Sequence, residues 1–141
     1  MLSGRKRSRP DAPPIFFLDR GIGRYIVADA LRQAGFEVVL MAAIYPDGTD
    51  ERVDDPTWIA RASSENWVAL TKDPSIVRAH EDALRASSLR VFAFNNAHLT
   101  GEVMAQRVVS NLQRIVQRSR QPGPFVYVIS VDGLERRWPR G

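Results

Sequence analysis

Residues 15–18 read Ile-Phe-Phe-Leu, and Asp19 follows them directly. A continuous apolar run of this length is typical of a strand that is buried on both faces, as the strands of parallel sheets are. Four later stretches have the same character and are also predicted to be strands: residues 36–40, 67–70, 89–94 and 125–129. The run at residues 15–18 therefore predicts the first strand of a buried sheet.

Segments with helical signals separate these strands. Helically spaced apolar residues or helix-start signals predict helices over residues 24–34, 55–66, 73–86 and 100–118. Residues 41–53 contain a Pro-Asp-Gly sequence and are expected to form a loop. The alternation predicts an α/β fold, a three-layer αβα sandwich around a mostly parallel five-stranded sheet. Because crossover connections are right-handed, few strand orders remain, and we expect 2-1-3-4-5.

The chain has 141 residues, which is enough for one domain with its own core. We place this domain at residues 15–131. Residues 1–14 combine basic side chains with three prolines and are expected to form a flexible basic N-terminal arm. Residues 132–141 are mostly polar and are expected to be a C-terminal tail.

The composition excludes several kinds of chemistry. There are no cysteines, so disulfide frameworks, iron–sulfur clusters and thiol nucleophiles are excluded. The two histidines, His80 and His98, cannot form a histidine-rich zinc site and are expected to be ordinary surface or capping residues. No apolar run approaches the roughly 18 residues of a membrane helix, and no apolar segment follows the basic start as in a secretory signal. These features predict a soluble, cytoplasmic protein.

The net charge of +4 hides a separation of charge along the chain. Residues 15–100 carry a net charge of −3, whereas residues 1–14 and 101–120 carry +3 each. Acidic clusters bind divalent cations, and basic segments attract phosphates. The alternative is that the basic segments are only a solvated arm and a solvated helix face.

Three aspartates are the candidate catalytic and metal-ligating residues. In a parallel sheet of the expected order, ligands bind at the carboxyl ends of the strands, between the first and the third strand. Asp19 follows the first strand, Asp73 follows the third, and Asp55 begins the helix between them. Carboxylates without cysteine or paired histidines suit Mg²⁺ or Mn²⁺.

Each aspartate also has a purely structural interpretation. Asp55 and Asp73 both precede a proline, as helix N-caps do, and Asp19 could begin a turn with Gly21. The residues Gly-Ile-Gly at 21–23 form an incomplete dinucleotide-binding motif, because the third glycine is absent. Trp58 and Trp67 are expected in the core. A phosphoacceptor domain also carries acids after strands one and three, but residues 128–132 lack the lysine such domains need.

The motifs Phe-Leu-Asp-Arg-Gly-Ile-Gly-Arg (17–24), Asp-Pro-Thr-Trp (55–58) and Leu-Thr-Lys-Asp (70–73) resemble those of PIN-like ribonucleases. The similarity is greatest to short bacterial toxin-type members of the VapC kind and covers residues 15–131. It implies that Asp19, Asp55 and Asp73 are the acids of a Mg²⁺ or Mn²⁺ site, with Asp54 as the alternative to Asp55. Candidates for the family's fourth acid are Glu81, Asp82 and the pair Asn95–Asn96, and none matches cleanly.

The resemblance implies a metal-dependent endoribonuclease that is the toxin of a toxin–antitoxin pair. The three aspartates would hold the metal and activate water, while Arg20, Arg24 and Lys72 would bind substrate phosphates. Expected partners are RNA, a cognate antitoxin protein and, as a candidate assembly, a second copy of the chain. The alternative is a catalytically inactive PIN-like module that binds nucleic acid or a partner.

Overall fold

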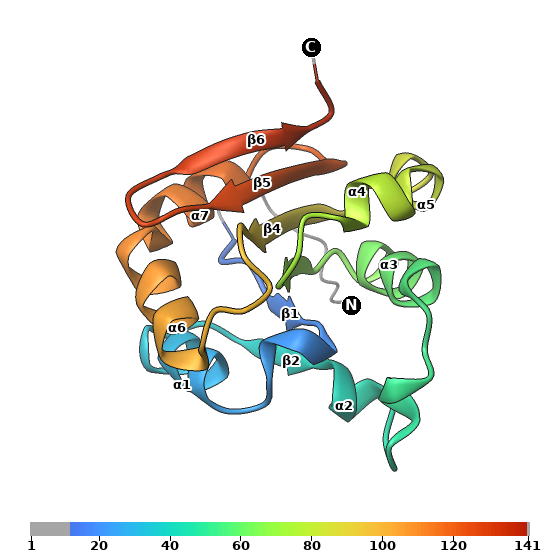
Figure 1. Ribbon diagram of the computed structural model, residues 1–141, viewed down its shortest axis with the longest axis horizontal. Coiled ribbons are helices and arrows are strands. Elements are labelled where there is room, and N and C mark those ends of the chain that lie inside the picture. Colours follow the sequence, from blue (N-terminus) through green and yellow to red (C-terminus); the bar gives the residue numbers. More distant parts are fainter. Residues whose placement is uncertain (1–11, 141) are drawn as a thin grey trace.

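The computed structural model describes residues 12–140, so most of the expected N-terminal arm lies outside the described residues. Within this range a single six-stranded sheet forms the centre of the molecule (Figure 1). The strand order is β2-β1-β3-β4-β5-β6. The strands are β1 (Phe16–Leu18), β2 (Val38–Leu40), β3 (Val68–Thr71), β4 (Arg90–Phe94), β5 (Phe125–Ile129) and β6 (Leu134–Trp138). The predicted α/β fold and the order 2-1-3-4-5 are confirmed.

The sixth strand was not predicted. Strands β1 to β5 pair in parallel, whereas β6 pairs antiparallel with β5 at the edge of the sheet. It is formed by the segment expected to be a polar tail. A short turn joins the two strands, with a hydrogen bond of 2.9 Å from Ser130 N to Gly133 O. An edge strand tolerates charged side chains. Trp138, which is 5% exposed, and the partly buried Leu134 pack β6 against the domain.

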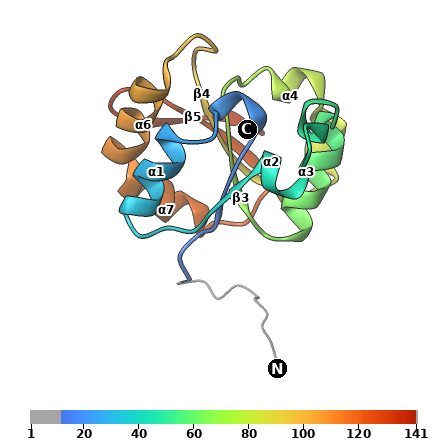
Figure 2. The same ribbon diagram turned by 90° about the horizontal axis from the view of Figure 1, so that it is seen from below.

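Two helical layers cover the sheet, one on each face (Figure 2). One layer contains α1 (Ile26–Gln33), α6 (Gly101–Ser110) and α7 (Leu112–Ser119). The other contains α2 (Met41–Ile44), α3 (Asp55–Ser64), α4 (Ile76–Ala79) and α5 (Glu81–Arg85). Each layer encloses its own hydrophobic cluster against the sheet. The three-layer prediction is therefore confirmed.

The helix boundaries differ from the prediction in three places. Residues 41–53, expected to be a loop, contain α2 and the 3-10 helix η3 (Thr49–Glu51). The helix predicted over residues 73–86 is two short helices that meet at His80. The helix predicted over residues 100–118 is interrupted at Asn111, whose side-chain amide donates to Arg107 O and Ser130 O. A side chain that binds backbone carbonyls in this way competes with regular helix geometry.

Phe17 shows how a strand that is buried on both faces serves both layers. Its neighbours Phe16 and Leu18 point into the cluster beneath α1, while Phe17 points into the cluster beneath α3. There its ring stacks on Trp67 at a centroid distance of 5.6 Å and contacts Trp58 at 5.4 Å. Both tryptophans are buried, as expected for core residues. No helix within residues 12–140 is both long and apolar enough to cross a membrane.

Candidate functional site

Asp19 lies at the carboxyl end of β1 and begins the 3-10 helix η2 (Arg20–Ile22). Its Oδ1 accepts a hydrogen bond of 2.9 Å from Gly21 N, so the expected turn with Gly21 is present. Its Oδ2 accepts a hydrogen bond of 2.5 Å from the hydroxyl of Thr71, at the end of β3. Because β1 and β3 pair in parallel register, Thr71 lies beside Asp19. Sequence reasoning missed Thr71, since only the pairing of the two strands brings it to the site.

The environment of Asp19 disfavours its ionised form. Burial raises the pKa of this carboxyl, and the nearby negative charge of Asp55 raises it further. Hydrogen bonds from Thr71 and Gly21 and the charge of Arg20 act in the opposite direction but do not cancel the effect of burial. A pocket carboxyl whose pKa is raised by burial and by a neighbouring charge is typical of a functional site.

We expect Asp19→Asn to stabilise the metal-free protein at pH 7 but not at pH 4. A carboxyl whose pKa is raised on folding contributes stability that is complete below its ordinary value of 3.8. That contribution is lost as the pH rises through the folded-state pKa. Asparagine has no charge to desolvate, so the variant does not lose this stability as the pH rises. Each kcal/mol of stability gained should raise the melting temperature by about 4 °C.

The measurement is thermal unfolding of both proteins with EDTA at the two pH values. A variant that melts below the wild type at pH 7, or that gains equally at both pH values, would contradict the origin assigned to the shift.

The N-cap of α3 is Asp54 and not Asp55, whereas Asp55 keeps its expected place in the candidate site. Asp54 Oδ1 accepts a hydrogen bond of 3.0 Å from Thr57 N. Hydrogen bonding to the side chain of Thr57 and, to a smaller extent, to its backbone N–H lowers the pKa of Asp54. Asp55 is therefore the first residue of the helix and not its cap, which corrects the prediction. The physical reason is reach, because a cap side chain bonds the backbone N–H two or three residues later, and Asp54 meets Thr57.

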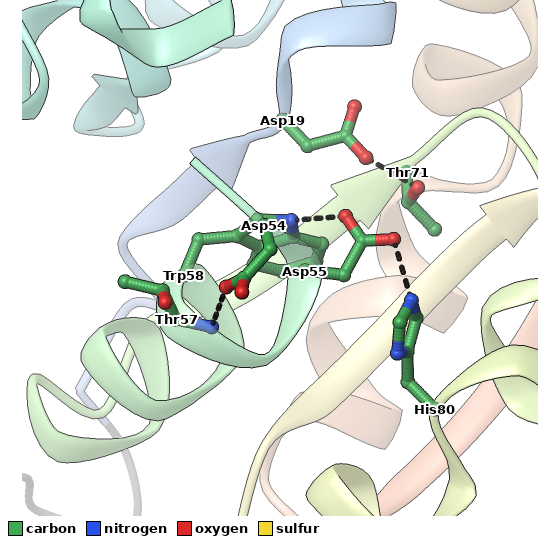
Figure 3. Close-up of polar contacts among 7 residues, drawn as sticks. All are labelled: Asp19, Asp54, Asp55, Thr57, Trp58, Thr71 and His80. Atoms are coloured by element: carbon green, nitrogen blue, oxygen red, sulfur yellow. Dashed lines mark hydrogen bonds and ion pairs between the residues drawn. The ribbon is translucent and has the colours of Figure 1, made fainter. Parts of the chain in front are cut away.

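Two ring nitrogens hold the carboxylate of Asp55 (Figure 3). Trp58 Nε1 donates a hydrogen bond of 2.8 Å to Oδ1. His80 Nε2 lies 3.1 Å from Oδ2 and forms an ion pair when the imidazole is protonated. His80, expected to be an ordinary surface or capping residue, is thus in contact with a candidate site residue. No sequence spacing indicates this contact, because 25 residues separate the two.

A pocket of about 260 Å³ joins the candidate residues at this edge of the sheet. All three predicted aspartates line it, together with Arg20, Lys72 and Thr71. Arg20 also donates a hydrogen bond to the backbone carbonyl of Asp50. Arg24 is exposed in the bend before α1 and does not line the pocket. The structure therefore brings together five of the six residues predicted from the sequence.

All three aspartates line the pocket, but their side chains do not form a complete set of metal ligands. Asp73 Oδ1 accepts a hydrogen bond of 2.9 Å from Ser75 N, and Ser75, not Asp73, is the N-cap of α4. Among the described residues no three Asp, Glu or His side chains are grouped closely enough to hold a metal ion. Glu81, a candidate fourth acid, is engaged by Trp138 Nε1 and Arg85, which lower the pKa of its carboxyl.

Residues 14–96 match the family described as PIN like domain, and the chain belongs to this family. It is similar to a protein of Mycobacterium tuberculosis (strain ATCC 25618 / H37Rv) named "Putative ribonuclease VapC45". The two are 31% identical over 122 residues, which cover 85% of this chain and 88% of that protein. No solved structure matches the chain significantly. The resemblance seen in the sequence motifs is confirmed.

Proposed function

We propose that the chain is a Mg²⁺- or Mn²⁺-dependent endoribonuclease and the toxin of a toxin–antitoxin pair. The observation that carries this proposal is the pocket in which Asp19, Asp55 and Asp73 meet Arg20 and Lys72. Acids with adjacent cations suit the hydrolysis of a phosphodiester, since one set can hold a metal and the other can bind phosphates. The relative named as a ribonuclease supports RNA as the substrate class.

The donor chemistry of the pocket fits a hard divalent cation. Mg²⁺ prefers oxygen ligands and is usually held by one or two carboxylates with waters and substrate phosphates, so a complete protein cage is not required. Asp19 and Asp55 would hold the ion, and Asp73 would be the third ligand. A cation there would offset the unfavourable charge of Asp19, whose pKa is raised by burial and by Asp55. When bound, the ion supplies positive charge beside the scissile phosphate.

The chain's own side chains provide the remaining functions. Lys72 would bind a phosphate oxygen as a mobile point charge, and Arg20 would do so with guanidinium nitrogens not used on Asp50. Arg24, exposed outside the pocket, would contact RNA further along the strand. Asp19 would also accept the proton that the attacking water loses. That water forms the new P–O bond as the bond to the ribose oxygen breaks, and the ribose oxygen takes up a proton as it leaves.

The proposal extends to the partners and location that the VapC resemblance implies. The protein would act on RNA in the cytoplasm and would be neutralised by a small cognate antitoxin. A homodimer is the assembly we would examine first. Co-purification of the chain with the product of a neighbouring reading frame, followed by loss of cleavage, would support the antitoxin.

Removal of divalent metal is expected to abolish cleavage of single-stranded RNA. The purified protein should cut RNA with Mg²⁺ or Mn²⁺, lose this activity in EDTA and regain it when excess metal is added. The physical reason is that Asp19 and Asp55 place negative charge where the phosphate must bind. The measurement is gel-resolved cleavage of a labelled RNA. Cleavage that continues in EDTA would contradict the proposal.

A second candidate function is a PIN-like module that binds RNA or a partner without cutting. The specific observation in its favour is that no three metal-binding side chains are grouped together within the described residues. The same assay separates the two functions. RNA binding in a filter or gel-shift experiment, with no cleavage in Mg²⁺ or Mn²⁺, would favour the binding module.

A further inference from the structure

His80 contacts the candidate site from outside the pocket. Its ring points towards the Asp55 carboxylate (Figure 3). His80 Nε2 lies 3.1 Å from Asp55 Oδ2, and the His80 side chain is 29% exposed. Trp58 Nε1 holds the other oxygen of the same carboxylate at 2.8 Å. The two rings belong to different segments, α3 and the junction between α4 and α5. Each oxygen of the Asp55 carboxylate therefore contacts a ring nitrogen, one from Trp58 and one from His80.

The backbone around His80 is held in place. Its N–H donates to Ile76 O at 2.9 Å, and its carbonyl accepts from Leu84 N at 3.1 Å. Ile76 and Leu84 are both buried in the hydrophobic cluster beneath α3. The junction between the two short helices is thus tied to the core on both sides, which fixes the backbone position from which the His80 side chain extends.

The C-terminal strand supports the same junction. Glu81, directly after His80, accepts a hydrogen bond of 3.1 Å from Trp138 Nε1 of β6. Arg85 pairs with Glu81 and lies over the Trp138 ring, with its guanidinium carbon 5.4 Å from the ring centroid. Trp138 is buried in the cluster that holds Ile76 and Leu84. The last strand therefore braces the residue next to His80.

We propose that His80 is a positioning residue that orients the Asp55 carboxylate towards the pocket, a role that rests on the proposed metal-dependent function. Ion pairs as exposed as this one contribute little to folding stability, and the Asp55 side chain is 43% exposed. We therefore assign the contact between His80 and Asp55 a role in orienting the Asp55 carboxylate, not in stabilising the fold. With one lone pair of each oxygen directed to Trp58 and His80, the remaining lone pairs of Asp55 stay free for a ligand in the pocket. Partners that orient ligating groups in this manner set metal affinity and activity.

The test compares His80→Ala and His80→Gln with the wild type. Glutamine offers an N–H donor at a reach similar to that of Nε2, whereas alanine offers none. For His80→Ala we expect kcat to fall about 10–100-fold with KM for RNA unchanged, and Mn²⁺ affinity to fall about tenfold. His80→Gln should recover kcat to within about threefold of the wild type. Mn²⁺ binding is measured by electron paramagnetic resonance without RNA, and melting temperatures are recorded for all proteins.

The other histidine provides the matched control. His98 is exposed in the loop between β4 and α6, and His98→Ala should leave kcat, KM and Mn²⁺ affinity unchanged. A wild type that binds Mn²⁺ and cleaves RNA, with His80→Ala identical in both, would overturn the role of His80 alone. A His80→Ala defect that glutamine does not relieve would also overturn it. A wild type that neither binds Mn²⁺ nor cleaves RNA would overturn the proposed function and this inference together.

Discussion

Replacement of Asp19 by asparagine is expected to reduce RNA cleavage by about a thousandfold or more while the protein stays folded. Asparagine has nearly the same shape, and its side-chain oxygen can still accept the hydrogen bond from Gly21 N. Its amide can donate to the Thr71 hydroxyl, which replaces the bond that this hydroxyl donates to Asp19. Only the negative charge is lost, and with it the ability to hold a cation or accept a proton.

The measurement is kcat/KM for a labelled single-stranded RNA in Mn²⁺, with circular dichroism as the check on folding. The matched control is Asp47→Asn, which makes the same chemical change at an exposed position in the loop before η3. Asp47 has a φ of 60°, a conformation that asparagine tolerates well. Cleavage at the wild-type rate by a folded Asp19→Asn protein would show that Asp19 is not a catalytic residue.

Replacement of Trp58 by alanine is expected to lower the free energy of unfolding by about 3–5 kcal/mol. Trp58 is 1% exposed and packs against Phe17, whose ring in turn stacks on Trp67. The truncation opens a cavity between the sheet and α3, and such a cavity collapses only partly. Urea denaturation should show a lower midpoint with an unchanged slope.

Trp58→Phe separates packing from the hydrogen bond to Asp55. Phenylalanine retains most of the buried ring but has no N–H for Asp55 Oδ1. We expect a smaller loss of stability than for alanine, together with reduced cleavage. A Trp58→Phe protein with full activity would show that the Asp55 carboxylate does not need this donor. A Trp58→Ala protein as stable as the wild type would contradict the assigned packing role.

Local patterns in the chain were enough to predict most of the fold. Each of the five parallel strands is a short apolar run, because a strand covered by helices on both faces has no solvent-facing side. Right-handed connections then left few strand orders. The edge strand β6 escaped prediction because three of its five residues are charged and only Trp138 is fully buried, so the segment resembles a tail. The break at Asn111 escaped it because it depends on a side-chain hydrogen bond to the carbonyl of the distant Ser130.

Some residues of the candidate site could be predicted from the sequence, and others could not. Asp19 and Asp73 were predictable because position after a strand places a side chain at the carboxyl edge of a parallel sheet. The choice between Asp54 and Asp55 was not, since two neighbouring acids before Pro56 offer the same capping signal. The observed cap on Thr57 N decides it and leaves Asp55 for the pocket.

The amino-acid sequence alone determined the class of fold and the edge of the sheet that carries the acids. These properties follow from hydrophobic pattern and residue chemistry, which are local. Only the tertiary structure decided that Thr71 holds Asp19, that His80 contacts Asp55, and that Trp138 supports the junction beside His80. Those contacts join residues 25 to 57 positions apart, and their geometry depends on how the strands and helices pack together.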